Sequence, residues 1–359
     1  MSYHLVRDPL EVTEVLRRPE DFLPSNALTS VVALRSATLR VLSQVGFALP
    51  PVLASATGKR HRTLRSVVAR FFTPEKVAAI QPRVIELTRA HCRTLVAELH
   101  TGRGTADLAI IGHRVPPAIM SELIGLPRPD LGLLKQWSQD SLELFWGWPG
   151  PARQLELASS ASQFYQWLRE QILASGGNDS LFGTLRTAGV DVREICSLGY
   201  FLLIAGQETT SQLTAICCYR ALQDPPRWRE LADGRRARDL VRHVLATESP
   251  VPTWRRTASR DTQLNGIPVP AGAEILLELS GNHPTNAPPS AYALAFGYGV
   301  HRCLGAKLAE LEAATILQET ARLLPDLTLS GPEPEWFRLL SFRTPRAVKV
   351  TALPTQGAQ

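Results

Sequence analysis

Residues 296–305 read Phe-Gly-Tyr-Gly-Val-His-Arg-Cys-Leu-Gly, and a stretch of helical periodicity begins directly after them at Ala306. The three glycines carry no Cβ, so this backbone can turn tightly and approach a flat group closely. A cysteine just before a helix N-terminus experiences the positive end of the helix dipole, which stabilises a thiolate. A lone cysteine in a glycine turn would ordinarily be a buried free thiol, so the role of Cys303 depends on the spacing of the residues around it.

The spacing of this segment, F-x-x-G-x-H-x-C-x-G, resembles the haem-ligand loop of the cytochromes P450 at every defined position. The resemblance implies haem b as the cofactor, with the thiolate of Cys303 as the axial ligand of the iron. Such a thiolate donates electron density to the iron and favours cleavage of an O–O bond. The resemblance also implies that Phe296, Gly297, His301 and Gly305 contact the haem.

A second motif lies in the longest helical signal, where residues 203–210 read Leu-Ile-Ala-Gly-Gln-Glu-Thr-Thr. Threonine in a helix tends to donate back to the carbonyl four residues earlier, and Gly206 leaves space for a neighbour. The stretch resembles A-G-x-[DE]-T-T on the oxygen side of the P450 haem. This implies that Ala205 and Gly206 lie against the haem. It also implies that Glu208 and Thr209 are catalytic and deliver protons to dioxygen.

Four basic residues match the contacts that hold the haem propionates in the P450s. His61 and Arg65 are four residues apart and so share one face of a helix. Arg256 begins the segment Arg-Thr-Ala at 256–258, and His301 lies in the segment 296–305. An arginine can hold a carboxylate through two parallel hydrogen bonds. The resemblance assigns all four to cofactor binding, whereas each of them alone could form an ordinary surface ion pair.

The chain has 359 residues, 44% of them hydrophobic, which is enough for the core of one large domain. The apolar periodicity and the capping residues predict helices over 9–17, from Pro74 with Thr73 as N-cap, and over 115–125, 131–145, 152–174 and about 191–222. Strands are expected only within 255–280, around a hairpin turn at Asn265-Gly266, and more weakly at 346–353. The prediction is a mostly α protein with a small β portion, a single domain over 1–359 with the cytochrome P450 fold.

The composition argues against two kinds of partner. The net charge of +6 is spread along the chain, without the basic blocks and interleaved aromatic residues that bind nucleic acid. No run approaches the ~18 apolar residues of a membrane span. The N-terminus lacks a signal pattern, so a cytoplasmic protein is expected. Buried thiols are expected at Cys92, Cys196, Cys217 and Cys218.

The basic residues that flank His61 have two interpretations. Lys59, Arg60 and Arg62 either form solvated surface, which is the usual role of such a group, or lie near the thiolate side of the haem. The resemblance implies that a ferredoxin-type electron donor docks there.

Three parts of the P450 pattern are missing. The E-x-x-R pair is replaced by His-Val-Leu-Ala at 243–246, and the arginine expected after Asn282 is absent. The chain also begins where P450s are already some way into the fold, which implies that an N-terminal helix and part of a sheet are absent. Losing one member of a buried ionic network costs about 3–5 kcal/mol, whereas replacing all of it can be neutral. We therefore expect 240–247 to remain a helix, with Val244 and Leu245 facing the core.

The expected function is that of a haem-thiolate oxidoreductase, which activates dioxygen to hydroxylate, couple or cyclise a small organic substrate of secondary metabolism. The substrate pocket is expected between residues 22–57, 145–148, Ala205, Gly206 and 252–254.

Two alternatives stay open. The first is a haem enzyme that uses peroxide, or that rearranges an N–O or O–O bond of a pre-oxidised substrate without external electrons. The missing ionic network favours it, and the intact motif at 206–209 opposes it. The second is a non-catalytic scaffold for a biosynthetic partner enzyme, which the presence of Cys303 and the four basic residues opposes.

Overall fold

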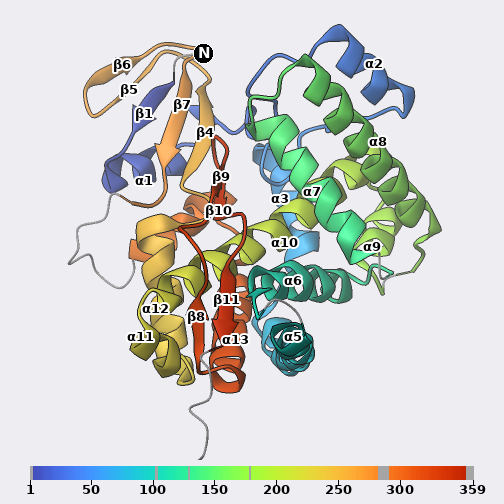
Figure 1. Cartoon of the computed structure of the whole chain (residues 1–359). Helices are drawn as coiled ribbons and strands as arrows, with labels where there is room; N and C mark the ends of the chain where they lie inside the picture. The colour runs from blue at the N-terminus through green and yellow to red at the C-terminus, as the bar shows by residue number, and fades with distance from the viewer. Residues whose placement is uncertain (1–2, 102–103, 128–129, 178, 282–290, 353–359) are drawn as a thin grey trace, which may run out of the picture.

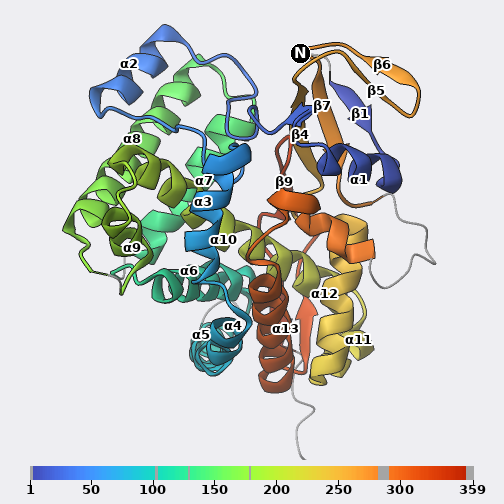
Figure 2. The ribbon, with the colours of Figure 1, turned by 180° about the vertical axis from the view of Figure 1, so that it is seen from behind.

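The longest helix, α10 (Val192–Leu222), passes through the centre of the molecule in both ribbon views (Figures 1 and 2). Its N-cap is Asp191, whose carboxylate accepts a hydrogen bond from the backbone N–H two residues later. A helix that is apolar on all sides has to be buried on all sides. Accordingly, α10 packs against α6 (Ala109–Ile124), α8 (Pro151–Ala174) and α13 (Ala306–Leu323), and the predicted long helix is confirmed.

The structure, a computed structural model, describes residues 3–101, 104–127, 130–177, 179–281 and 291–352. The remaining helices surround α10 (Figure 1). They are α1 (Pro9–Arg17), α2 (Ser36–Gln44), α3 (Gly58–Ala69), α4 (Pro74–Ala79), α5 (Gln81–Thr101), α7 (Leu131–Trp146), α9 (Leu181–Thr187), α11 (Pro225–Glu230) and α12 (Gly234–Glu248), with short 3-10 helices η1 (Ala291–Phe296) and η2 (Gly299–His301).

The helix boundaries follow the capping residues closely. α1 has the predicted bounds, and α4 begins at Pro74 because the hydroxyl of Thr73 accepts a hydrogen bond from the N–H of Lys76 at 3.3 Å. The predicted start of α6 was wrong, since the helix begins six residues earlier and carries Pro116 and Pro117 in its interior. Proline is normally confined to the first helical turn, which is why the sequence favoured a later start.

Within the described residues, the strands form four small sheets. The largest has the order β1 (His4–Val6), β7 (Glu274–Glu278), β4 (Thr253–Ala258) and β2 (Phe22–Leu23). The others are the hairpin of β5 (Thr262–Leu264) with β6 (Ile267–Val269), the pair β9 (Trp336–Arg338) with β10 (Arg343–Pro345), and the sheet of β3 (Ala106–Asp107), β11 (Lys349–Ala352) and β8 (Leu327–Leu329).

The hairpin turn and the late strand are confirmed. Asn265 and Gly266 have φ values of 48° and 78°, as a two-residue turn between antiparallel strands requires, and β11 lies within 346–353. The expectation that strands are otherwise confined to 255–280 was wrong. The additional strands have only two or three residues each, which is too short for an alternating pattern to be recognised.

The helix that lacks the E-x-x-R pair is intact. α12 includes 240–247, and Val244 and Leu245 are buried in the core, as predicted. Glu248, at its C-terminal end, accepts two hydrogen bonds from Arg220 at the end of α10. The position of the second missing arginine, after Asn282, lies outside the described residues.

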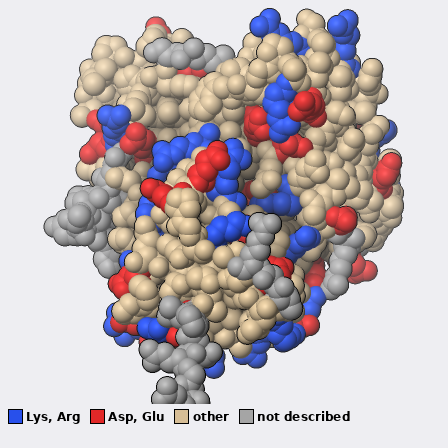
Figure 3. Space-filling view, viewed as in Figure 1, with Lys and Arg blue, Asp and Glu red and all other residues tan. Residues whose placement is uncertain are grey.

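The surface and the cysteines agree with the composition. Charged side chains of both signs are interspersed over the face shown in Figure 3, most of which is uncharged. Within the part of the chain that the structure describes, no helix is both long and apolar enough to cross a membrane. Cys92, Cys196, Cys217 and Cys218 are buried, as expected.

Two buried glutamates of α13 allow a matched test of buried charge. Glu312 is 1% exposed and its Oε2 has no partner among the described residues, so burial raises the pKa of this carboxyl well above 4.5. A carboxyl whose pKa is raised in the native state contributes stability that is fully present below its pKa in the unfolded state. This contribution is lost as pH rises through the native-state pKa. Above about pH 4.5 the parent should therefore lose up to ~1.4 kcal/mol of unfolding free energy per pH unit because of Glu312. We expect Glu312→Gln not to show this loss.

The measurement is urea unfolding of both proteins across this pH range, and the variant should gain on the parent as pH rises. Glu319→Gln is the control on the same helix. Glu319 is 4% exposed and bonds Arg89 at 2.6 Å and Arg322 at 3.3 Å, so its replacement should destabilise instead. Equal pH profiles for the parent and Glu312→Gln would contradict the prediction.

Candidate active site

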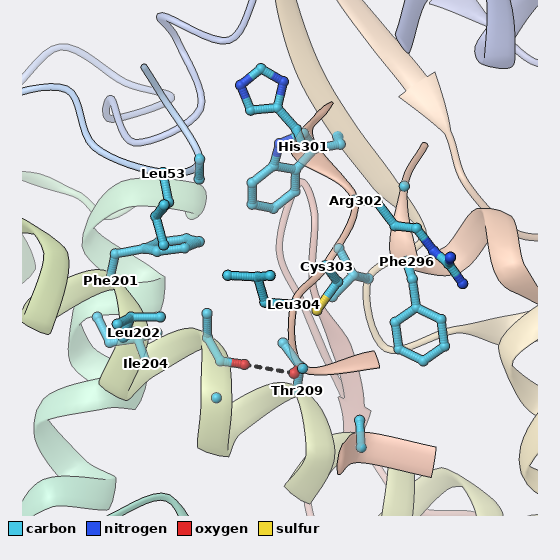
Figure 4. Close-up of a pocket in the computed structure, with 18 of the residues that line it drawn as sticks. Leu53, Phe201, Leu202, Ile204, Thr209, Phe296, His301, Arg302, Cys303 and Leu304 are labelled. Atoms are coloured by element: carbon cyan, nitrogen blue, oxygen red, sulfur yellow. Dashed lines mark hydrogen bonds between the residues drawn. The ribbon is translucent and has the colours of Figure 1, made fainter. Parts of the chain in front are cut away.

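A cavity lies between α10 and the segment 296–305 (Figure 4). Other parts of its wall come from the region before α3, the end of α7, β4 and the turn between β9 and β10. Each segment expected to form the pocket contributes some lining residues, including Leu53, Phe145 and Trp254, although most of 22–57 lies elsewhere. Trp148 does not line the cavity, since its side chain is 59% exposed. Segments that are remote in the sequence thus converge on one apolar space.

The loop that carries Cys303 is tightly folded. The backbone N–H of Cys303 donates to the carbonyl of Phe296 at 2.8 Å, and the thiol is accessible from the cavity. Gly299 has φ of 68°, and a Cβ on it would come within 2.9 Å of the carbonyl oxygen of Leu16. Only glycine therefore fits at this point of the loop. Gly305 is the N-cap of α13 and donates its N–H to the sulfur.

The pKa of the Cys303 thiol was expected to be lowered by the helix N-terminus, but it is raised. Burial raises the pKa of the Cys303 thiol, and this effect outweighs the opposing effects of the Gly305 N–H, Arg65 and Arg302. Burial therefore opposes the thiolate that the helix N-terminus favours. A metal ion bound to the sulfur would produce the thiolate, because coordination deprotonates a thiol.

Hydrogen bonds from other segments hold this loop in place. Arg17 of α1 donates to the hydroxyl of Tyr298 at 3.1 Å, and Arg65 of α3 donates to the carbonyl of Arg302 at 2.5 Å. His301 lies 2.8 Å from the carbonyl oxygen of residue 56 and donates to it through Nε2. These bonds show how the loop is anchored without the missing ionic network.

Beside the loop, basic groups converge without an acid to neutralise them. Arg256 is 3% exposed, and its guanidinium donates to the neighbouring carbonyl of Arg255, with no carboxylate partner among the described residues. Burial lowers the pKa of Arg256 to about 10. The rings of His61 and His301 lie 4.5 Å apart, and the buried Nε2 of His61 has no hydrogen-bond partner within the described chain. Groups of this kind fit an anion.

On the opposite wall, α10 presents the second motif. The hydroxyl of Thr209 lines the cavity and donates to the carbonyl of Ala205 at 2.8 Å (Figure 4). Ala205 and Gly206 also line it. A Cβ at position 206 would come within 2.8 Å of the sulfur of Met120. The glycine therefore admits the side chain of α6, in addition to bordering the cavity.

Glu208 does not line the cavity but points to α7. Its side chain is 1% exposed, and Lys135 lies 2.7 Å from Oε1 and 2.8 Å from Oε2. Burial raises the pKa of Glu208, and the ammonium of Lys135 partly offsets this. Lys135 was not among the predicted site residues, and its only local signal is its position beside the buried Leu134 of α7.

Comparison with known proteins identifies the family. No family model matches the chain. It is 30% identical over 317 residues to the cytochrome P450 monooxygenase PikC of Streptomyces venezuelae, covering 82% of this chain and 74% of the relative. It is also 30% identical to the erythromycin C-12 hydroxylase of Saccharopolyspora erythraea, covering 78% and 75%. The chain belongs to the cytochrome P450 family.

The solved structures agree with this assignment. A cytochrome P450 named CREJ, in complex with (4-ethylphenyl) dihydrogen phosphate, superposes with a TM-score of 0.89 at 25% identity and covers 98% of this P450. The mostly helical single-domain P450 fold is therefore confirmed. Haem bound through a cysteine thiolate is the cofactor of the family, and this P450 is accordingly a haem enzyme of the monooxygenase class.

The residues of the cavity fit a haem. Its thiolate ligand would be Cys303, its two carboxylates would occupy the space beside the unneutralised Arg256 and the unpaired Nε2 of His61, and Arg65 lies close enough to Cys303 to affect its pKa. The glycine-rich loop would lie along one face, with Ala205 and Gly206 along the other. The donors and the apolar walls thus match a flat dianion that is otherwise hydrophobic.

Replacing the proposed ligand should separate Cys303 from the other cysteines. We expect Cys303→Ser to abolish the red-shifted Soret band of the reduced, carbon-monoxide-treated protein, because a hydroxyl does not supply a thiolate. Cys196→Ser, at a buried thiol away from the cavity wall, should retain that band. An unchanged spectrum in Cys303→Ser would contradict the assignment of the ligand.

Removing the two arginines should weaken haem retention. A hydrogen bond to a charged group contributes about 1.5–3 kcal/mol, so Arg65→Ala or Arg256→Ala alone should lower the haem content partly. The double variant should be purified largely without haem, as measured by the ratio of Soret to protein absorbance. Arg62→Ala, an exposed residue of the same helix, is the control and should bind haem fully. Full occupancy of the double variant would show that the propionates lie elsewhere.

Proposed function

We propose that this P450 activates dioxygen to oxidise a small organic secondary metabolite, with electrons from a ferredoxin-type carrier. The observation that carries the proposal is the arrangement of two neighbouring residues of α10. Thr209 presents its hydroxyl to the cavity, while Glu208 lies behind it as a buried carboxylate. Relatives in the same family include a hydroxylase of erythromycin and a hydroxylase/epoxidase of mycinamicin IV, which supports a tailoring reaction.

Bound haem would supply the redox centre at which dioxygen is reduced. Thr209 positions the molecule that donates a proton. Its own hydrogen is donated to the carbonyl of Ala205, so its oxygen is free to accept a hydrogen bond from a water in the cavity. A water held in this way has its other hydrogen available for transfer. The hydroxyl thus orients a proton donor rather than giving up its own proton.

Glu208 is suited to resupply that water. The ammonium of Lys135 compensates the cost of burying the carboxylate, and neither residue is among those that line the cavity. Because the two side chains are 1% and 12% exposed, the path through them connects the buried helix to the molecular surface without opening the cavity to bulk water. Glu208 therefore affects how fast protons arrive, whereas Thr209 affects where they are delivered.

The electron donor is proposed to dock beside α3. Lys59 and Arg62 are exposed on this helix, and Arg60 is paired with Glu194. The same helix carries Arg65, which bonds the loop of Cys303. An acidic carrier bound here would be separated from the cofactor by one layer of protein, and its association should weaken as salt is raised.

A P450 that needs no carrier is the second candidate. The absence of E-x-x-R favours a specialised chemistry, such as use of peroxide or rearrangement of a pre-oxidised substrate. Such an enzyme would need neither Thr209 nor Glu208. A non-catalytic scaffold would need neither these residues nor Cys303. The three functions therefore differ in which variants retain activity.

Two substitutions on α10 should give different defects. We expect Thr209→Ala to consume dioxygen and electrons but to release hydrogen peroxide, so that product formed per electron falls, because the water is no longer positioned. Glu208→Gln should slow turnover with less loss to peroxide. Contributions of this kind are typically about 10²–10⁴-fold in rate. The measurement is product, peroxide and reductant consumed in parallel with one substrate.

Thr214→Ala is a matched control, since this hydroxyl donates to the carbonyl four residues earlier at 2.9 Å, as that of Thr209 does, but is not among the residues that line the cavity. Product formed under strict anaerobiosis, without reductant, would overturn the proposal in favour of the second candidate.

A further inference from the structure

Part of the lining of the cavity is an aromatic wall. Its six aromatic members come from α7, α10, β4 and the turn after β9, and three of them pack closely. The ring of Trp146 lies 5.1 Å from that of Phe342 at an interplanar angle of 80°, and 6.3 Å from Trp254. The members of this aromatic wall are Phe145, Trp146, Tyr200, Phe201, Trp254 and Phe342.

The aromatic wall is fixed from behind. The carbonyls of Phe145 and Trp146, at the end of α7, accept hydrogen bonds from the N–H groups of Val31 at 3.0 Å and Leu340 at 2.9 Å. The guanidinium of Arg255 lies 5.9 Å from the ring of Trp146 and donates to a loop carbonyl at 2.8 Å. The rings are therefore held in place by three separate segments, and a ligand meets a preformed surface.

The charges around the cavity are of one sign. Among the described residues that line it there is no aspartate or glutamate, and the charged ones are Arg65, Arg256 and Arg302. Arg65 and Arg256 belong to the edge assigned to the haem carboxylates, and Arg302 belongs to the loop of Cys303. The nearest buried acid on α10, Glu208, is already bonded to Lys135. A cationic group on a substrate would thus be buried without a counter-ion, which is unfavourable.

We propose that the substrate of this P450 is an uncharged molecule that places a flat aromatic ring against the aromatic wall. Edge-to-face packing on Trp146 and Phe342 favours an aromatic ring over a saturated one of the same size. The absence of an acid from the described lining disfavours an amine. The inference rests on the proposed function for the use of the cavity, and it concerns binding rather than the reaction.

Three ligands that share one bicyclic carbon skeleton test charge and aromaticity separately. The probes are 2-naphthalenemethanol, the quaternary amine (2-naphthylmethyl)trimethylammonium, which is cationic and has no lone pair that could coordinate iron, and the saturated decahydro-2-naphthalenemethanol. We expect the first to bind the holoenzyme at least about tenfold more tightly than the amine and about two- to tenfold more tightly than the saturated alcohol. Titration calorimetry measures binding itself, and the Soret shift shows whether the ligand reaches the haem.

Variants locate the preference. Phe342→Leu should bring the affinities for the aromatic and saturated alcohols close together. Phe337→Leu, on the neighbouring strand and outside the cavity lining, should leave the ratio unchanged. Equal binding of the amine or of the saturated alcohol, failure of all three to bind, or an unchanged ratio in Phe342→Leu would each overturn the inference. Tight binding without dioxygen-dependent product would instead count against the proposed function alone.

Discussion

The structure depends on a buried positive charge that the described part of the chain does not neutralise. Arg256 is 3% exposed, and it donates a hydrogen bond to the neutral carbonyl of the preceding residue. Keeping a guanidinium in such a place without a counter-ion is costly. The cost is offset when a dianionic cofactor occupies the neighbouring cavity, so β4, α3 and the cysteine loop can meet there without ion pairs among themselves. Haem is, in this sense, part of the core.

The cysteine loop shows how an ionic network can be replaced. With E-x-x-R absent from α12, single hydrogen bonds hold the loop. Arg17 of α1 donates to the hydroxyl of Tyr298, and Arg65 of α3 donates to the carbonyl of Arg302. His301 donates to the carbonyl of residue 56, before α3. Each of these bonds has a neutral partner, so the loss of any one leaves no pair of buried charges unbalanced. The helix that normally carries the network then packs through Val244 and Leu245.

The sequence sufficed for those features that are contiguous in the chain. The cysteine loop and the motif on α10 were recognisable because their glycines, acid and hydroxyls have fixed local spacing, and a capped helix such as α4 was placed from Thr73 and Pro74. Features created by tertiary contact were not. Lys135 is an ordinary helical lysine until α7 brings it to Glu208, and nothing local connects Trp146 with Phe342. Strands of two or three residues exist only because a partner strand pairs with them.

The close packing of Met120 against Gly206 has a chemical consequence. Apart from Met1, Met120 is the only methionine of the chain, and its side chain lines the cavity. Under the proposed function, hydrogen peroxide released in the cavity would be close to this thioether, and oxidation to the sulfoxide would add a polar oxygen where the backbone of α10 leaves no room. One added oxygen on this residue, detected by mass spectrometry, would thus show that the protein molecule had been exposed to peroxide in its own cavity.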